Sequence, residues 1–233
     1  MNPVAALLFS ITVINLFLSS FIFFRNISSN IHRSLSAFIF LVGIWTLSMG
    51  MFYQVTDLSD ARFWIKATYI SGIIIANTLV YFALVFPQNE KLPLLQTISI
   101  YLPSLPLLFA FIVFPTFLHR EIINYGWWKD VILGTPEYIF YTIYFTAVYY
   151  GALFIVWRKY TLYRGTTKIQ ILYLLVSLLI AGSFGAVFDL LFPWIALYKS
   201  LIEPNSFISS VAPFSPMPFM PIILSDGSPL KPL

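Results

Sequence analysis

The sequence predicts an all-α membrane protein, a polytopic helix bundle with six clear transmembrane helices and a partial or broken seventh. The chain is 59% hydrophobic and only 9% charged, against about 45–50% apolar and 25% charged residues in soluble domains. Apolar segments of about 20 residues recur along it, which is the length needed to cross a hydrocarbon core roughly 30 Å thick. No alternation of apolar and polar residues with period two accompanies them, so helices are favoured over a barrel.

The six predicted spans follow one another from the N-terminus, mostly with short connections. The first follows Met1-Asn2-Pro3 without a preceding basic residue, so we expect a retained anchor and not a signal peptide. Pro103 and Pro106 interrupt the fourth span, and each should kink the helix because proline lacks a backbone donor. The spans cover residues 4–24, 35–53, 63–86, 94–114, 138–157 and 169–192.

Two segments do not fit a simple bundle. Residues 115–137 are the one long connection, and we expect an interfacial hairpin or helix there, with a lid as the alternative. From residue 204 onward the chain holds seven of its fifteen prolines, which is too dense a loss of backbone donors for an intact spanning helix. The predicted domains are therefore a multi-pass bundle over residues 1–203 and an irregular proline-rich tail over residues 204–233.

The basic residues of the connections predict the orientation. Seven lie between the first and second, third and fourth, and fifth and sixth spans, and five lie on the opposite side among acidic residues. The positive-inside rule then places the N-terminus outside. The net charge of +4 is spread over short loops, so the lipid bilayer is the expected partner and nucleic acid is not. The seven residues are Arg25, Arg33, Lys91, Arg158, Lys159, Arg164 and Lys168.

Four polar residues within the spans are candidates for sensing or for contacts between helices. Asp189 and Lys66 lie about one turn inside the outer ends of their helices. An ionisable group in a span is a functional candidate by default, but this position favours a structural interfacial role, including a pair between the two. Asn15 and Asn77 lie deeper and favour interhelical hydrogen bonds, worth about 0.6–2 kcal/mol each.

Two further patterns concern packing. Tyr138, Tyr141 and Tyr144 recur every three residues along the fifth span, which favours an aromatic packing stripe, with an apolar ligand pocket at its outer end as the alternative. Residues 181–186 contain two overlapping pairs of small residues spaced by four. Such pairs let helix backbones approach closely, so a homodimer formed through them is a hypothesis.

No motif for catalysis, cofactor binding or metal binding is visible in the sequence. The chain has no cysteine, which excludes thiolate ligands and cysteine nucleophiles. Its two histidines, His32 and His119, lie in connections on opposite sides of the predicted bundle. We therefore predict no catalytic residue, no cofactor and no metal, and we do not expect an enzyme.

Three stretches resemble the N-terminal seven-transmembrane sensor region found ahead of the kinase module in many prokaryotic sensor histidine kinases. In residues 64–87 an aromatic-rich span ends in Phe86-Pro87, residues 134–138 lead into the tyrosine-rich span, and residues 164–175 carry the basic connection and the start of the sixth span. The resemblance covers about residues 1–193. It implies a sensory domain in the prokaryotic plasma membrane that receives a stimulus and passes it to a cytoplasmic kinase or another transmitter module.

The chain departs from that family at the seventh helix, where the proline-rich tail follows. It also carries no histidine phosphoacceptor box and no glycine-rich ATP lid, which suggests a sensor truncated at the seventh helix and without its kinase module. Two alternatives come from other classes of protein. A small multi-pass transporter or permease requires polar groups and broken helices near the bilayer midplane, and a membrane assembly or scaffold protein requires a constant partner.

Overall fold

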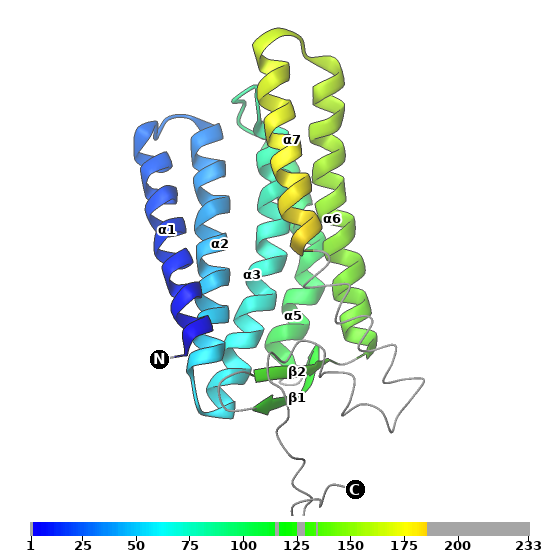
Figure 1. Cartoon of the computed structure of the whole chain (residues 1–233). Helices are drawn as coiled ribbons and strands as arrows, with labels where there is room; N and C mark the ends of the chain where they lie inside the picture. The colour runs from blue at the N-terminus through cyan, green and yellow to red at the C-terminus, as the bar shows by residue number, and fades with distance from the viewer. Residues whose placement is uncertain (1, 115–116, 125–128, 134, 186–233) are drawn as a thin grey trace, which may run out of the picture. The chain divides into compact units, whose positions relative to one another are not determined.

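The computed structural model describes residues 2–114, 117–124, 129–133 and 135–185, all of which belong to one compact unit. Within them, six helical stretches are long and apolar enough to cross a membrane, and two short strands form the β-structure (Figure 1). The all-α polytopic bundle is therefore confirmed. The predicted seventh span, the end of the sixth and the proline-rich tail lie outside the described residues. The elements are α1 (Pro3–Arg25), α2 (Asn30–Gln54), α3 (Leu58–Val85), α4 (Leu94–Tyr101), the 3-10 turn η1 (Leu102–Ser104), α5 (Leu105–Val113), β1 (His119–Asn124), β2 (Lys129–Leu133), α6 (Thr135–Leu162) and α7 (Gly165–Gly185).

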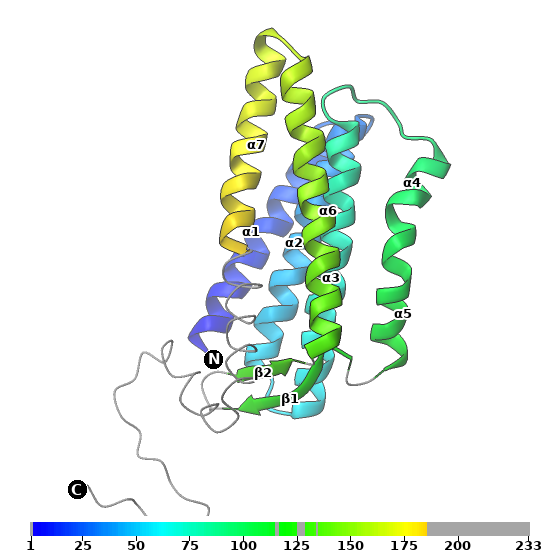
Figure 2. The same cartoon turned by 90° about the vertical axis from the view of Figure 1, so that its right-hand side faces the viewer.

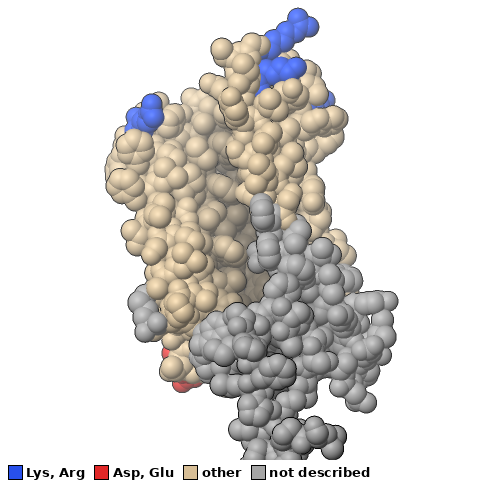
Figure 3. Space-filling view, in the orientation of Figure 1, with Lys and Arg blue, Asp and Glu red and all other residues tan. Residues whose placement is uncertain are grey.

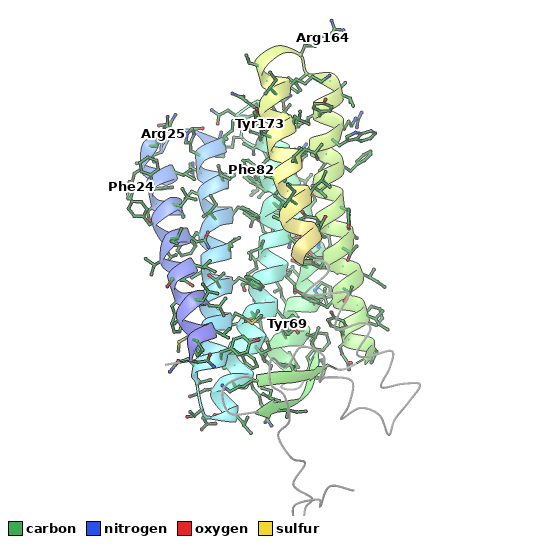
Figure 4. All side chains as sticks on the ribbon, in the orientation of Figure 1. Phe24, Arg25, Tyr69, Phe82, Arg164 and Tyr173 are labelled. Carbon is green, nitrogen blue, oxygen red and sulfur yellow. The ribbon has the colours of Figure 1, made fainter. Side chains whose placement is uncertain are left out.

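Helix α3 is the centre of the described bundle. Helix α2 and helix α6 both pack on it, α1 packs on α2, α7 packs on α6, and α4 and α5 lie along it (Figures 1 and 2). In α3 61% of the spanning window is buried, against 11% in α1 and 6% in α7. The main apolar core joins α3, α6 and α7, and Phe82 lies within it (Figure 4). The outer helices therefore present most of their apolar surface outward, as expected for helices that face lipid.

A seam of small residues joins α1 to α2. The buried residues of α1 recur every seven positions, and small buried residues of α2 do the same. A seven-residue repeat keeps one helix face against its partner, and small side chains allow close approach where lipid supplies no hydrophobic drive between helices. The sequence predictions omit this seam, although its spacing is visible in the sequence. Its members are Ala5, Thr12 and Ser19 in α1 and Ser36, Gly43 and Gly50 in α2.

Hydroxyl groups link the two helices across this seam. The hydroxyls of Thr12 and Thr46 lie 2.9 Å apart. Ser19 donates to the Ser36 carbonyl at 2.9 Å, and Ser36 donates to the Ser19 carbonyl at 2.9 Å. These reciprocal bonds fix the register of α1 on α2, because each hydroxyl would otherwise have to find a partner within an apolar environment.

The fourth span is interrupted where its two prolines lie. Helix α4 ends at Tyr101, the 3-10 turn η1 contains Pro103, and α5 begins with Pro106 in its first turn. Both prolines remove a backbone donor, so the regular ladder of helix hydrogen bonds cannot run through this stretch. The predicted interruption of the fourth span is confirmed.

The long connection after α5 forms a β-hairpin. Its strands pair antiparallel, which selects the hairpin over the helix as the structure of this connection. Ile122 of β1 packs into a cluster with Phe52, Ala61 and Ile65, so the hairpin lies against the adjoining ends of α2 and α3. This is the end of the bundle at which the N-terminus also lies (Figure 1).

Charged side chains gather at the two ends of the described bundle, and its visible flank carries none (Figure 3). Basic side chains lie at the end that carries Arg25 and Arg164 (Figure 4). The acidic Asp57 and Asp60 lie at the opposite end, at the start of α3. Backbone and side-chain hydrogen bonds from Ser59 lower the pKa of Asp57, the N-cap residue of that helix.

The α1/α2 seam leads to the first prediction. A Cβ added at Gly50 would lie 2.7 Å from Cε1 of Phe9, whereas a Cβ at Gly151 would meet nothing within 4 Å. We expect Gly50→Leu to lower the unfolding free energy by about 1–3 kcal/mol through overpacking. The matched substitution Gly151→Leu adds the same side chain at an open position of α6, and we expect it to leave stability unchanged. Unfolding of the purified chain in bicelles measures both, and equal losses would contradict a close-packed seam.

Candidate functional site

Three lysines bind backbone carbonyls at the C-terminal ends of helices. We call them the lysine clamps: Lys66, Lys129 and Lys159. The last carbonyls of a helix have no partner within it, and a cation is favourable there because the helix dipole places negative partial charge at this end. Lys66 on α3 donates to the carbonyls of Phe111 and Phe114, both at 3.2 Å, and so holds the end of α5 against α3.

The second clamp fixes the hairpin to α2. Lys129 on β2 is 4% exposed and donates to the carbonyls of Phe52 at 2.9 Å and Tyr53 at 3.2 Å, and also to that of Val55. Desolvation lowers the pKa of Lys129 from the ordinary lysine value of 10.5. Its apolar surroundings therefore disfavour the charge, and the carbonyls supply the compensating acceptors.

The third clamp joins α6 to the end of α3. Lys159 donates to the carbonyls of Ala83 at 2.9 Å and Leu84 at 2.6 Å, and also to that of Phe86. Helix α3 ends at Val85 because Phe86 precedes Pro87, and the residue before a proline is disfavoured in the helical conformation. The carbonyls that this ending leaves free are thus the ones that Lys159 binds.

The predicted site residues are not all brought together. Asp189 lies outside the described residues, so its proposed pair with Lys66 stays a prediction, and the Lys66 ammonium binds the end of α5. Asn15 lies beside the seam, with its Cβ 3.4 Å from a Cβ built at Gly43. None of the described residues hydrogen-bonds its amide. Lys129 and Lys159 were not predicted from the sequence as contacts between elements, although both make them.

Asn77 lies at the centre of a polar group inside the bundle. Its side chain is 1% exposed, and its Oδ1 accepts a hydrogen bond of 2.7 Å from the Tyr144 hydroxyl of α6. Its Nδ2 has no hydrogen-bond partner among the described residues. A buried amide donor of this kind is costly when unpaired, so the Nδ2 group of Asn77 can donate a hydrogen bond to a second partner.

The polar group extends to the interruption of the fourth span. Ser104 of η1 lies close enough to the Tyr144 hydroxyl to act on it electrostatically, and it donates to the Tyr101 carbonyl at 2.6 Å. The Tyr101 hydroxyl lies 3.3 Å from that of Thr78. These residues with Asn77 form what we call the Asn77 cluster, which links α3, α6 and the broken fourth span.

A ladder of aromatic rings runs from α5 through α3 to α6. Phe111 stacks on Tyr69 at 6.3 Å between ring centroids, and Tyr69 meets Tyr141 edge to face at 5.1 Å. Along α6, Tyr141 stacks on Phe145 at 6.1 Å and Phe145 on Tyr149 at 6.2 Å. Such pairs add about 0.5–1.5 kcal/mol each beyond burial. Of the predicted tyrosine stripe, Tyr141 packs against other rings, whereas Tyr144 donates to Asn77. Figure 4 shows Tyr69 inside the bundle.

Two glycines make room for the tyrosine hydroxyls of this ladder. A Cβ at Gly72 would lie 2.7 Å from the Tyr141 hydroxyl oxygen, and a Cβ at Gly182 would overlap Tyr149. Tyr149 also donates to the Leu178 carbonyl. Gly182, which the sequence analysis assigns to a possible contact between copies of the chain, is thus occupied from within the chain. A homodimer stays a prediction.

The described residues contain no group of three or more histidine, aspartate or glutamate side chains that could hold a metal. Several of their buried polar side chains, such as Thr12, Ser19 and Asn77, connect one helix to another. The fold and these contacts define a multi-pass membrane helix bundle.

Comparison with known families identifies the bundle further. The family model for the N-terminal 7TM region of histidine kinase matches residues 7–223 of the 233 in the chain. The chain therefore belongs to this family of membrane sensor regions. The match continues past residue 193, where the resemblance predicted from the sequence ends, into the proline-rich segment. No curated protein and no solved structure matches the chain.

The second prediction tests a lysine clamp. Lys159→Met keeps the length of the side chain but leaves the carbonyls at the end of α3 without their donor. We expect a loss of about 1–3 kcal/mol in unfolding free energy. Arg158→Met removes the same charge from the neighbouring exposed position and should have little effect. Equal effects of the two substitutions would mean that charge alone, and not the clamp, matters.

Proposed function

We propose that this chain is a membrane signal-input domain that receives a stimulus in its helix bundle and passes it to a cytoplasmic histidine-kinase transmitter. The observation that carries the proposal is the family match over residues 7–223 together with six apolar helices able to span a membrane. Stimulus and output then communicate through a shift between two packings of the bundle, each favoured by different contacts.

The Asn77 cluster is the element best suited to such a shift. It joins three spans through hydrogen bonds between uncharged groups, and interhelical bonds of this kind are worth about 0.6–2 kcal/mol. Coupling energies between distant sites are typically about 1–3 kcal/mol. Making or breaking the Tyr144–Asn77 hydrogen bond would therefore change the free energy of the bundle by about as much as such coupling requires. The adjoining α4 has no buried residue, so it can move at small packing cost, whereas Lys66 and the ring of Tyr69 hold α5 against α3.

The aromatic ladder supports a route from this span toward the C-terminal part of the chain. It begins at Phe111 of α5, runs along α6 to Tyr149, and ends in the contact of Tyr149 with Leu178 and Gly182 of α7. Helix α7 is the last described helix, and residues 186–233 follow it in the sequence. A displacement of α5 would reach α7 through rings packed against one another.

We also propose that the domain lies in the prokaryotic plasma membrane with its N-terminus outside. The basic residues Arg25 and Arg164 lie at the bundle end opposite the N-terminus (Figures 1 and 4). By the positive-inside rule that end faces the cytoplasm.

The third prediction tests signal coupling. The full chain is joined after Leu233 to the dimerisation and ATP-binding modules of a histidine kinase, and autophosphorylation is measured in inside-out vesicles. Tyr144→Phe removes one interhelical hydrogen bond, so basal autophosphorylation should change by about 3- to 30-fold. Tyr150→Phe is the matched control, because Tyr150 lies on the same helix and is 51% exposed. Identical activities of the two variants and the parent would count against the proposal.

The fourth prediction tests orientation. Because the chain has no cysteine, each introduced cysteine is its sole thiol. Ser59→Cys lies at the start of α3 and Thr166→Cys at the start of α7, and neither substitution changes a charge. We expect a membrane-impermeant maleimide to label Ser59→Cys in intact cells and Thr166→Cys only after permeabilisation. The reverse pattern would place the N-terminus inside.

A further inference from the structure

A cleft of about 570 Å³ lies between α2, α3 and α4, within the range of about 300–1,000 Å³ typical of small-ligand sites. The side chains that line the cleft change from basic to apolar along its length. Arg33 and Lys91 line it at the basic end of the bundle, and Ala37, Leu41 and Ile74 line it within the spans. From Arg33 to Leu41 the helix rises about 12 Å. The cleft is therefore amphipathic, with cationic and apolar parts in sequence.

Asn89 holds the connection that carries Lys91 against the start of α2. Its Oδ1 accepts hydrogen bonds from the Ser29 hydroxyl at 2.9 Å and the Ile31 backbone N–H at 3.0 Å. The Asn30 amide donates to the Asn89 carbonyl at 3.0 Å. Asn89 has φ 58°, a left-handed conformation that asparagine tolerates better than most residues. The connection between α3 and α4 is thereby tied to the start of α2, which brings Lys91 to the same cleft as Arg33.

The charges at the mouth are of one sign. Among the described residues that line the cleft none is acidic. Glu90, the neighbour of Lys91, acts electrostatically on Lys159 of α6, which is not among the lining residues. Hydroxyl groups of Ser34 and Thr97 also line the cleft. Arg33 and Lys91 therefore favour an anion, and the hydroxyls add hydrogen-bonding groups of the kind that fix a polar headgroup.

We propose that this cleft binds an anionic phospholipid, with its phosphate at Arg33 and Lys91 and part of an acyl chain against Ala37, Leu41 and Ile74. Basic pockets between transmembrane helices suit anionic lipid headgroups. The apolar part of the cleft favours a lipid over a free phosphate, because a free phosphate has no acyl chain to pack against it. The leucines Leu94 and Leu95 of the adjoining α4 are 76% and 79% exposed, so lipid chains reach this side of the bundle.

Bound lipid would also touch the Asn77 cluster. Thr78 and Tyr101 line the inner part of the cleft, and their hydroxyls lie 3.3 Å apart. An acyl chain between α3 and α4 would press on this contact. The binding itself does not depend on the proposed signalling function, so the two are tested separately.

Native mass spectrometry of the purified full chain, titrated with phosphatidylglycerol, tests the proposal. Arg33→Gln with Lys91→Gln should weaken binding about tenfold. Arg158→Gln with Arg164→Gln removes the same charge from exposed positions that do not line the cleft, and should leave binding within about twofold. Equal losses in the two double variants would overturn the proposal, because general surface attraction would then account for the lipid.

A second pair of variants tests the apolar part of the cleft. Ala37→Trp fills it and should reduce phosphatidylglycerol binding at least fivefold, whereas Ala147→Trp adds the same ring to an exposed position of α6 and should not. Phosphatidylcholine and glycerol phosphate are the ligand controls, and both should bind at least tenfold more weakly. Glycerol phosphate binding as tightly as phosphatidylglycerol, or Ala37→Trp binding lipid normally, would contradict an acyl-chain site. Circular dichroism confirms that each variant is helical before binding is compared.

Discussion

The arrangement of the described bundle depends on how the C-terminal ends of its helices are satisfied. In a bilayer a free carbonyl has no water to bind, and a lysine ammonium is also costly there without acceptors. The lysine clamps resolve both costs at once. Each comes from a different element, so Lys129 joins the hairpin to α2, Lys159 joins α6 to α3, and Lys66 joins α3 to α5. These contacts link elements that are distant in sequence, and two of the three act on α3 or from it.

Contacts between uncharged residues complete the bundle, and they are much closer in some parts of it than in others. The α1/α2 seam combines glycines with reciprocal hydroxyl bonds, such as those between Ser19 and Ser36, and so has close packing along its length. The fourth span differs, because it is broken at η1 and buries little beyond Phe111 and Ser104. The α1/α2 pair on one side of α3 is thus closely packed, whereas α4 on another side buries none of its residues.

The sequence was sufficient for features that depend on composition and backbone chemistry. Span length, the interruption at Pro103 and Pro106, and the depth of Asn77 all follow from hydropathy and from the missing proline donors. The lysine clamps could not be predicted in this way. A lysine near a span end is ordinarily expected to snorkel, and its partners here are backbone carbonyls, which carry no residue signature. The same holds for Asn89, whose role depends on a left-handed φ and on the approach of α2. The seven-residue spacing of Thr12 and Ser19, by contrast, could have been recognised from the sequence.

The cleft, the Asn77 cluster and the aromatic ladder meet at the broken fourth span. Thr78 and Tyr101 belong to both the cleft and the cluster, and Tyr144 of the cluster lies one residue before Phe145 of the ladder. Under the proposed function, a ligand that binds two positions of α4 with different affinity would also shift the packing equilibrium of α6 and α7. Such coupling is reciprocal, since a change in packing at α7 must alter affinity at the cleft by the same factor. In this bundle the lipid environment and the signalling state would then be linked through one short polar contact between α3 and α4.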